Sequence, residues 1–150
     1  MRALLQRASR GEVRVDERVT GSIGHGLVVL LGVGHGDDEA AADWMARRIT
    51  ELRIFEDDDG RTNRSLIDVG GAVLLVSQFT LYADTRRGRR PGFTDAADPV
   101  PAKALWLRVA SMIGAQGVHV GLGEFGAEME VELVNDGPFT IWLDTADRTA

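Results

Sequence analysis

The sequence predicts an α+β fold, in which two helices pack on a mainly antiparallel β-sheet or partial barrel. Two segments carry apolar residues at helical spacing, and about six or seven others have the short apolar runs or alternation of strands. No linker, repeat or low-complexity stretch divides the 150 residues. We therefore expect residues 1–150 to form a single domain, which is long enough to bury its own core.

Residues 2–34 are predicted to be β structure. Val13 and Val15 alternate with charged residues, and residues 18–23 lead through Gly24-His25-Gly26 into an aliphatic run over residues 27–31. We expect two hairpins in this region.

A first helix is predicted to follow Asp37, which can act as its N-cap. Its apolar residues follow helical spacing and should face a sheet: Ala42, Met45, Ala46, Ile49 and Leu52. After this helix, residues 52–55 can start a strand, and the acidic run at 56–60 is a turn by composition.

The segment 73–83 joins a buried strand to polar chemistry. An aliphatic run, typical of a strand buried on both faces, continues without Gly or Pro into Ser77, Gln78, Phe79 and Thr80. Hydroxyls, an amide and backbone N–H groups at a rigid strand end are well placed to hold a substrate. The alternative is an ordinary strand that happens to end in Ser and Thr.

A loop from residue 84 to about residue 98 follows, and it contains Arg86, Arg87, Arg89 and Arg90. A second helix is predicted to start near Asp98, with prolines in its first turn, and to stop at Gly114 or Gly117. Its expected buried residues are Leu105, Val109 and Met112, with Trp106 as a further candidate.

The last third of the chain has the clearest alternation. Glutamates at 124, 128, 130 and 132 point one way, and the apolar set points the other way: Phe125, Ala127, Met129, Val131 and Leu133. We expect a strand here, a break at residues 135–140, and a final strand that ends at about Leu143.

Composition limits the classes of function. The formal net charge of −6 argues against general nucleic-acid binding, although the arginine loop could hold a phosphate backbone locally or be a solvated turn. The chain has no cysteine, its three histidines are scattered, and no stretch has the ~20 apolar residues that span a bilayer. We expect a soluble cytoplasmic protein with no metal, no cofactor, no DNA partner and no membrane partner.

Gly32, Gly34 and Gly36 before the first helix imitate a dinucleotide-binding loop. The spacing is wrong, because Asp37 occupies the place of the third required glycine and would put a negative charge against a pyrophosphate.

Three separated motifs together resemble the D-aminoacyl-tRNA deacylase family. They are residues 77–83 (SQFTLYA), residues 125–129 (FGAEM) and residues 135–140 (NDGPFT). The likeness extends to Gln6-Arg7, to the loop ending in Arg90-Pro91 and to the order of strands and helices. Phe139 and Tyr82 depart from the residues common in the family, which affects the expected shape of the pocket rather than the class.

The resemblance implies a homodimer that hydrolyses the ester between a D-amino acid and the terminal adenosine of tRNA, a proofreading step in translation. It implies that Ser77, Gln78, Phe79 and Thr80 line the catalytic site, with the Phe79 N–H stabilising the oxyanion and the ribose 2′-hydroxyl taking part in the cleavage. It further implies that a cis Gly137-Pro138 dipeptide, held by Arg7, enters the partner's pocket and rejects L-residues, with Met129 and Asn135 as further substrate-binding residues. Glycyl-tRNA would pass this screen, and the loop arginines would bind tRNA.

Two other classes remain open. One is a non-catalytic RNA- or aminoacyl-binding module with the same fold, for which loss of the polar strand end or of Gly137-Pro138 would be the expected sign; both are present. The other is a nucleotide-binding domain that uses Gly32 to Gly36, which titration with a dinucleotide would test.

Overall fold

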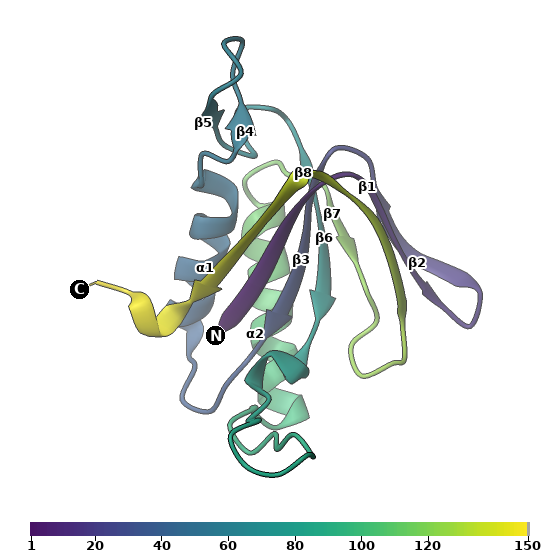
Figure 1. Ribbon diagram of the computed structural model, residues 1–150, viewed down its shortest axis with the longest axis vertical. Helices are drawn as coiled ribbons and strands as arrows, with labels where there is room; N and C mark the ends of the chain where they lie inside the picture. The colour runs from purple at the N-terminus through teal and green to yellow at the C-terminus, as the bar shows by residue number, and fades with distance from the viewer. Residues whose placement is uncertain (150) are drawn as a thin grey trace.

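A long first strand, β1 (Arg2–Val15), organises the sheet of the computed structural model, which describes residues 1–149 (Figure 1). The first half of β1 pairs antiparallel with β3 (Gly26–Gly32), and its second half pairs antiparallel with β2 (Arg18–Ile23). Along its other edge, β1 pairs antiparallel with β8 (Glu130–Asp144). The predicted antiparallel core of the sheet is confirmed.

The sheet becomes parallel beyond β3. Strand β6 (Ala72–Ser77) pairs parallel with β3, and β7 (Val120–Leu122) pairs parallel with β6. The second predicted hairpin is wrong, because β3 pairs with β1 rather than with β2. Strand β3 is apolar along almost its whole length, so it is stable only between two strands and under a covering layer. A small separate ribbon consists of β4 (Phe55–Glu56) and β5 (Thr62–Arg64).

The sheet curls so that β2 approaches β7. A Cβ atom on Gly21 would lie 2.7 Å from the backbone N and O of Leu122, so only glycine allows this approach. The curled sheet encloses a small apolar cluster: Ala8, Val13, Ile23, Val28, Leu74 and Val76. This arrangement is the partial barrel expected from the sequence.

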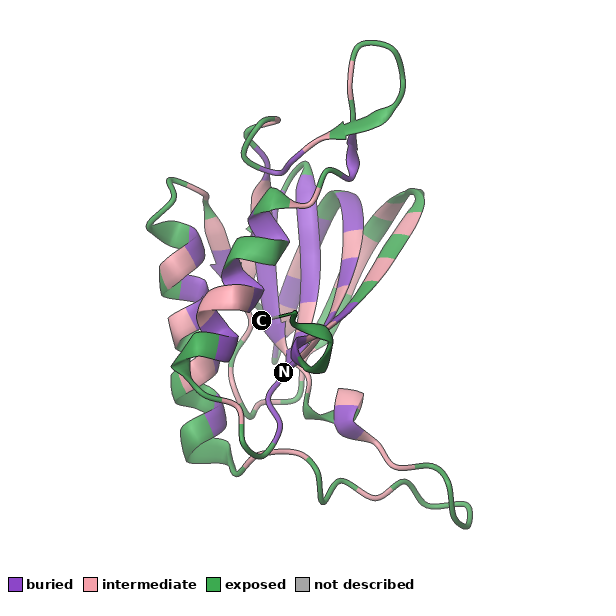
Figure 2. Cartoon of the chain, turned by 90° about the vertical axis from the view of Figure 1, so that its left-hand side faces the viewer, coloured by how far each residue is buried: buried purple, intermediate pink, exposed green. Residues whose placement is uncertain are grey.

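Two helices, α1 (Glu39–Glu51) and α2 (Pro99–Gly114), cover the other face of the sheet (Figures 1 and 2). The main core fills the space between helices and sheet, and Trp106 belongs to it, whereas Leu105 and Met112 are only partly buried. No helix within residues 1–149 is both long and apolar enough to cross a membrane.

The N-cap of α1 is Asp38 and not Asp37. The Asp38 carboxylate accepts a hydrogen bond from the Ala41 backbone N–H at 2.8 Å. Asp37 instead accepts hydrogen bonds from the Gly34 N–H at 2.7 Å and from the Met1 ammonium at 2.6 Å. A carboxylate gains more from a charged donor than from a capping bond, which explains the shift of one residue.

A two-bond ion pair joins the two helices. Arg108 of α2 donates from Nε and Nη2 to the two Asp43 carboxylate oxygens of α1 at 2.7 and 3.0 Å. These hydrogen bonds hold the pKa of Asp43 below its ordinary value.

We expect Asp43→Asn to lower the thermal midpoint at pH 7. A carboxylate whose pKa is depressed by folding stabilises the protein above its unfolded pKa, near 4, and loses that contribution as the pH falls through the folded pKa. Thermal melts from pH 7 to pH 3 should therefore show the two proteins converging at the acidic end. Asp59→Asn, in the exposed β4–β5 turn, is the control. An Asp43→Asn deficit that persists unchanged at pH 3 would contradict this account.

Candidate active site

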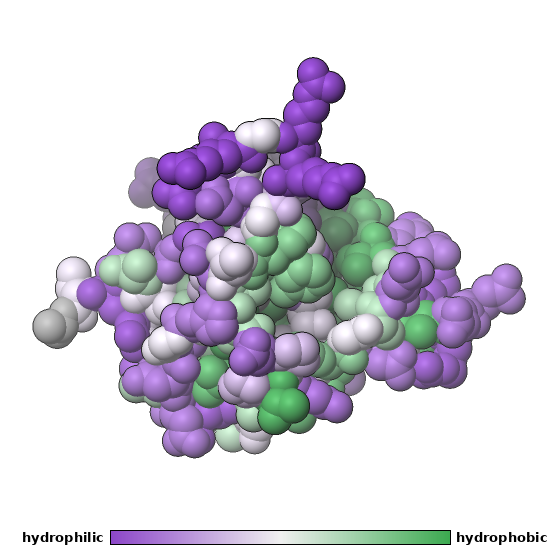
Figure 3. Space-filling view, turned by 90° about the horizontal axis from the view of Figure 1, so that it is seen from below, coloured by the Kyte–Doolittle hydropathy of each residue, from purple (hydrophilic) through white to green (hydrophobic). Residues whose placement is uncertain are grey.

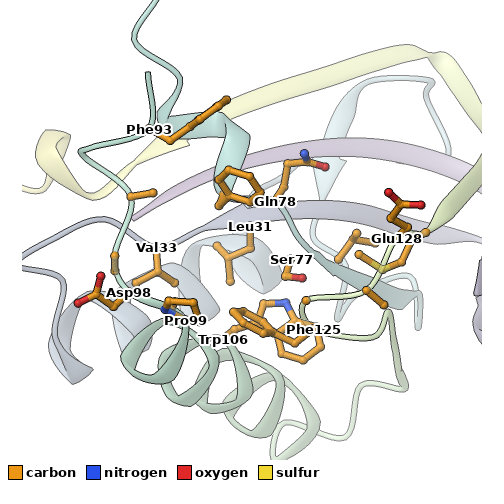
Figure 4. A pocket seen from close by; sticks show the side chains of 18 of the residues that line it. Leu31, Val33, Ser77, Gln78, Phe93, Asp98, Pro99, Trp106, Phe125 and Glu128 are labelled. Carbon is orange, nitrogen blue, oxygen red and sulfur yellow. The ribbon is translucent and has the colours of Figure 1, made fainter. Parts of the chain in front are cut away.

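A cavity of about 680 Å³ opens at the end of β6, at the lower end of the molecule in Figure 1. Its inner wall is apolar and includes Leu31, Val33 and Trp106, while Ser77, Gln78 and Glu128 bring polar atoms to it (Figure 4). From below, this end shows hydrophobic side chains framed by hydrophilic ones (Figure 3). A mostly apolar cavity of this size with a few polar groups is typical of a small-ligand site.

The predicted polar strand end lies on the wall of this cavity. Strand β6 stops at Ser77, the Gln78 N–H donates to the Leu31 carbonyl at 2.8 Å, and a short 3-10 helix, η1 (Phe79–Tyr82), follows. Ser77, Gln78 and Phe79 line the cavity. Thr80 is exposed next to it, and its hydroxyl accepts a hydrogen bond from the Gln78 amide.

The Phe79 backbone N–H is available to a ligand. As the first residue of η1, Phe79 has no preceding helical carbonyl to bind, and its N–H donates to no acceptor within residues 1–149. A backbone N–H without an acceptor, at a residue that lines a cavity, is the kind of donor that can stabilise an oxyanion.

Residues 125–129 reach the site by a turn, where the alternation in the sequence predicts a continuous strand. The predicted strand from residue 124 begins only at Glu130, because the chain turns at Gly126, whose φ of +80° is the left-handed region that favours glycine. The turn places Phe125 and Met129 on the cavity wall. The glycine within an alternating pattern was the signal for this break.

Phe93 and Trp106 also line the cavity, and neither was predicted as a site residue. Phe93 packs edge-on against Phe79, with ring centroids 5.1 Å apart, and both rings are partly exposed at the cavity mouth. Backbone hydrogen bonds from His35 N–H to the Asp95 carbonyl and from Ala97 N–H to the Val33 carbonyl anchor this part of the loop. Exposed aromatic rings in a loop carry no sequence periodicity, so only the fold reveals their position.

The four loop arginines are not equivalent. Arg86 donates two hydrogen bonds to the Asp84 carboxylate, each at 2.8 Å, and this pairing holds the pKa of Asp84 well below its usual range. Arg87, Arg89 and Arg90 are exposed and form no ion pair within residues 1–149. Their positive charges are available to an anionic partner.

Gly137 and Pro138 lie far from the cavity of their own chain. Strand β8 is continuous through this region, although its pairing with β1 shifts register on both sides of Ala8, and the Gly137-Pro138 bond is cis. Arg7 pairs with Leu27 at the start of β3, whereas Ser77 pairs with Leu31, so roughly 13 Å of strand separates the two ends.

The buried Arg7 supports the Gly137-Pro138 segment from its buried side. Its guanidinium donates to the carbonyls of Ile54 at 2.7 Å and Asp136 at 3.2 Å, and its Cζ lies 4.7 Å from the centre of the Phe139 ring. Arg7 therefore lies against this segment, and its part in holding the dipeptide for substrate binding stays a prediction.

The Asn135 side chain is occupied within the same segment. Its Oδ1 accepts from the Phe139 N–H at 3.0 Å and its Nδ2 donates to the Thr140 hydroxyl at 3.1 Å. In this structure Asn135 therefore shapes the segment, and contact with substrate stays a prediction.

Two of the three glycines that imitate a dinucleotide loop, Gly32 and Gly34, are covered by the Tyr82 ring, whereas Gly36 is open. A Cβ on Gly34 would lie 2.7 Å from the Tyr82 ring, so there is no room for a pyrophosphate between Gly34 and Tyr82. Burial, together with the charge of Asp37, raises the pKa of Tyr82. The Asp37 carboxylate beside Gly34 adds a repelling charge.

The fold and the cavity define a class: an α+β protein with a largely apolar cavity suited to a small ligand and a backbone N–H without an acceptor at a residue that lines it. The comparisons with known proteins specify the class further. The family model described as D-Tyr-tRNA(Tyr) deacylase matches residues 4–144. A D-aminoacyl-tRNA deacylase of Thermomicrobium roseum is 57% identical over 98% of this chain and 96% of that protein. One of Roseiflexus castenholzii is 60% identical over 97% and 93%, respectively.

Solved structures agree on the fold. A structure described as c-Myc DNA Unwinding Element Binding Protein superposes with a TM-score of 0.90 at 34% identity, over 96% of this chain and 98% of that one. A probable eukaryotic D-amino acid tRNA deacylase gives a TM-score of 0.80 at 19% identity, over 95% and 97%. The chain belongs to the D-aminoacyl-tRNA deacylase family and is a hydrolase of that kind.

Proposed function

We propose that the cavity at the end of β6 takes the terminal adenosine of D-aminoacyl-tRNA and holds its ester against the Phe79 N–H. The observation that carries this proposal is an unpaired backbone donor on the wall of a largely apolar cavity of about 680 Å³. An apolar cavity suits a nucleobase, and a fixed donor beside it suits the oxygen of an ester carbonyl.

The proposed reaction needs no side-chain base. Water adds to the ester carbonyl carbon while the Phe79 N–H stabilises the developing oxyanion; the bond to the ribose 3′-oxygen then breaks and that oxygen takes a proton. The neighbouring 2′-hydroxyl relays this proton from the attacking water to the 3′-oxygen, so the products are the free D-amino acid and tRNA with a terminal 3′-hydroxyl. No histidine lines the cavity, and the hydrogen-bond partner of the Thr80 hydroxyl is the Gln78 amide, which is not a base and would not activate Thr80 as a nucleophile.

Chirality is proposed to be screened by the Gly137-Pro138 segment of a second copy in a homodimer. An enzyme that accepts many D-residues must recognise what they share, which is the Cα configuration and the amino group. Both residues are exposed in one chain, Arg7 holds them from the buried side, and they lie far from their own cavity. These features favour a segment that acts on a neighbour.

Matched D-, L- and glycyl-tRNA test the proposal directly. D-aminoacyl and glycyl esters should both be lost, since glycine has no side chain to reject, whereas the L-ester should persist at the rate of spontaneous hydrolysis. Equal loss of the D- and L-esters would refute the chiral screen.

Mixed dimers can show which chain supplies the screen. Pro138→Ala should hydrolyse L-esters, and Phe79→Pro, which lacks the oxyanion N–H, should be inactive. When excess Phe79→Pro chain is exchanged into a fixed amount of Pro138→Ala, each active cavity faces an intact Pro138. Hydrolysis of the L-ester should then fall several-fold while that of the D-ester is kept. If L-ester hydrolysis stayed constant after exchange, confirmed by mass spectrometry of the dimers, the screen would act within one chain.

The loop arginines are proposed to bind the phosphates of the tRNA acceptor end. Replacing Arg87, Arg89 and Arg90 together by Ala should raise KM for tRNA. The slope of log KM against log salt concentration should also decrease, by at most about three. Arg86→Ala should do less, because Asp84 already neutralises Arg86. A salt titration of KM from 50 to 300 mM compares them, and identical slopes for all proteins would exclude the loop as a phosphate site.

A further inference from the structure

Trp106 carries the one buried side-chain polar atom without a hydrogen-bond partner within residues 1–149. The side chain is on α2 and is only 2% exposed, so almost none of its surface faces bulk solvent. A buried donor without an acceptor costs free energy, and a buried Trp usually finds a partner for its N–H.

Other buried polar side chains of this protein are satisfied. Arg7 donates to the Ile54 carbonyl, the Thr50 hydroxyl to the Ala46 carbonyl, and the Thr145 hydroxyl to the Met1 carbonyl. The Ser65 hydroxyl accepts from the Asp68 N–H. The unpaired state of Trp106 is therefore specific to the place where its ring lies.

That place is the wall of the active-site cavity. The Trp106 ring packs against Phe125, with centroids 5.8 Å apart, and Figure 4 shows the indole nitrogen on the edge of the ring that is turned toward Ser77. Leu31, Val33 and Ala102 on the same wall offer no side-chain acceptor. The Ser77 hydroxyl, which the nitrogen faces, makes no hydrogen bond with it, so an acceptor on a ligand in the cavity would satisfy the indole N–H.

The chemistry of the indole limits what this occupant can be. An indole N–H donates and cannot accept, so it matches a lone pair and opposes another donor. In an adenine, the ring nitrogens are acceptors and the 6-amino group is a donor. Given the proposed function, in which the terminal adenosine enters this cavity, the N–H can meet a ring nitrogen of the base.

We propose that the Trp106 indole N–H donates a hydrogen bond to a ring nitrogen of the terminal adenine and thereby positions the nucleoside in the cavity. Trp106 is a positioning residue in this assignment, since it touches the base and not the ester.

The test combines atomic changes on both sides of the bond. D-aminoacyl-tRNAs ending in adenosine, 1-deaza-, 3-deaza- or 7-deazaadenosine are assayed with the wild-type protein and with Trp106→Phe. The analogue that lacks the ring nitrogen bound by Trp106 should lower kcat/KM of the wild type about tenfold, mainly through KM. With natural tRNA, Trp106→Phe should have a kcat/KM about tenfold lower than that of the wild type. That analogue and natural tRNA should be equivalent for Trp106→Phe. If each analogue changes both proteins by the same factor, the proposal is wrong.

Trp142→Phe, at an exposed position of β8 outside the cavity, is the matched control and should behave as the wild type with every substrate. Circular dichroism and a thermal melt check that Trp106→Phe folds. If it does not, the indole ¹⁵N–¹H resonances of the wild-type protein serve instead. The resonance of the Trp106 indole proton should move downfield with a non-hydrolysable 3′-aminoacyl-adenosine, and it should not move with the deaza version that lacks the ring nitrogen bound by Trp106. If the two ligands shifted this resonance equally, the proposal would be wrong.

Failure of the proposed function gives a different result. A wild-type protein that hydrolyses tRNA ending in cytidine as fast as tRNA ending in adenosine does not read the base in this cavity at all. A preference for adenosine that is identical in wild type and Trp106→Phe would leave the cavity assignment intact and remove Trp106 from it.

Discussion

Phe79→Pro is expected to lower kcat for D-aminoacyl-tRNA by about 10²–10³-fold, because proline has no backbone N–H to give to the oxyanion. Phe79 is the first residue of η1, and the first position of a helix is where proline is tolerated. Its N–H makes no hydrogen bond within residues 1–149, so the substitution breaks no internal bond. The loss should therefore appear in catalysis and not in stability.

Phe79→Ala separates the donor from the ring. This variant also loses the contact with Phe93, but it keeps the N–H, so its kcat should stay within about tenfold of the wild type if the N–H carries the catalytic effect. Single-turnover hydrolysis at saturating enzyme measures both variants, with thermal melts as a check on folding. Equal loss in Phe79→Ala and Phe79→Pro would assign the effect to the ring and contradict the oxyanion role.

The position of this donor could be predicted only in part from the sequence. The run from Val73 into Ser77 correctly marked the end of a buried strand, because aliphatic residues followed by polar ones leave few other options. The start of η1 at Phe79 depends on the bond from Gln78 to Leu31, which is a tertiary contact. Local propensity does not encode that contact.

The cavity wall was harder to predict for the same reason. Trp106 has the helical spacing of a core residue and does belong to the core. It also lines the cavity, and the sequence does not distinguish the two because cores and cavity walls consist of the same apolar residue types. Phe125 was assigned to a strand because its alternation with glutamates is regular, and the left-handed Gly126 overrides that pattern. The distance between Gly137-Pro138 and the cavity follows from the pairing of β1 with β3 and β8, which no local pattern fixes.

A D-aminoacyl-tRNA that ends in 2′-deoxyadenosine is expected to be hydrolysed at least about 10²-fold more slowly than the natural substrate. Proton transfer by a positioned group contributes about 10²–10⁴-fold, and the cavity of this chain offers no histidine to supply it. Ser77 and Gln78 line the cavity, yet neither a hydroxyl nor an amide is a general base at neutral pH. The cavity wall also carries the carboxylates of Asp98 and Glu128, which can act as bases, so the deoxy substrate distinguishes a relay through the substrate's own hydroxyl from one through these side chains.

The deoxy substrate must be compared with its own spontaneous hydrolysis, because removal of the 2′-hydroxyl also slows the reaction in buffer. The expected loss is in the ratio of enzymatic to spontaneous rate, and competition binding with a non-hydrolysable analogue should show that affinity changes far less. Thr80→Ala provides the opposite comparison: a nucleophilic Thr80 would make this variant inactive, whereas a substrate-assisted reaction keeps its rate within about tenfold. Rapid hydrolysis of the deoxy ester, together with an inactive Thr80→Ala, would establish Thr80 as the nucleophile, because the hydroxyl that matters would then belong to the protein.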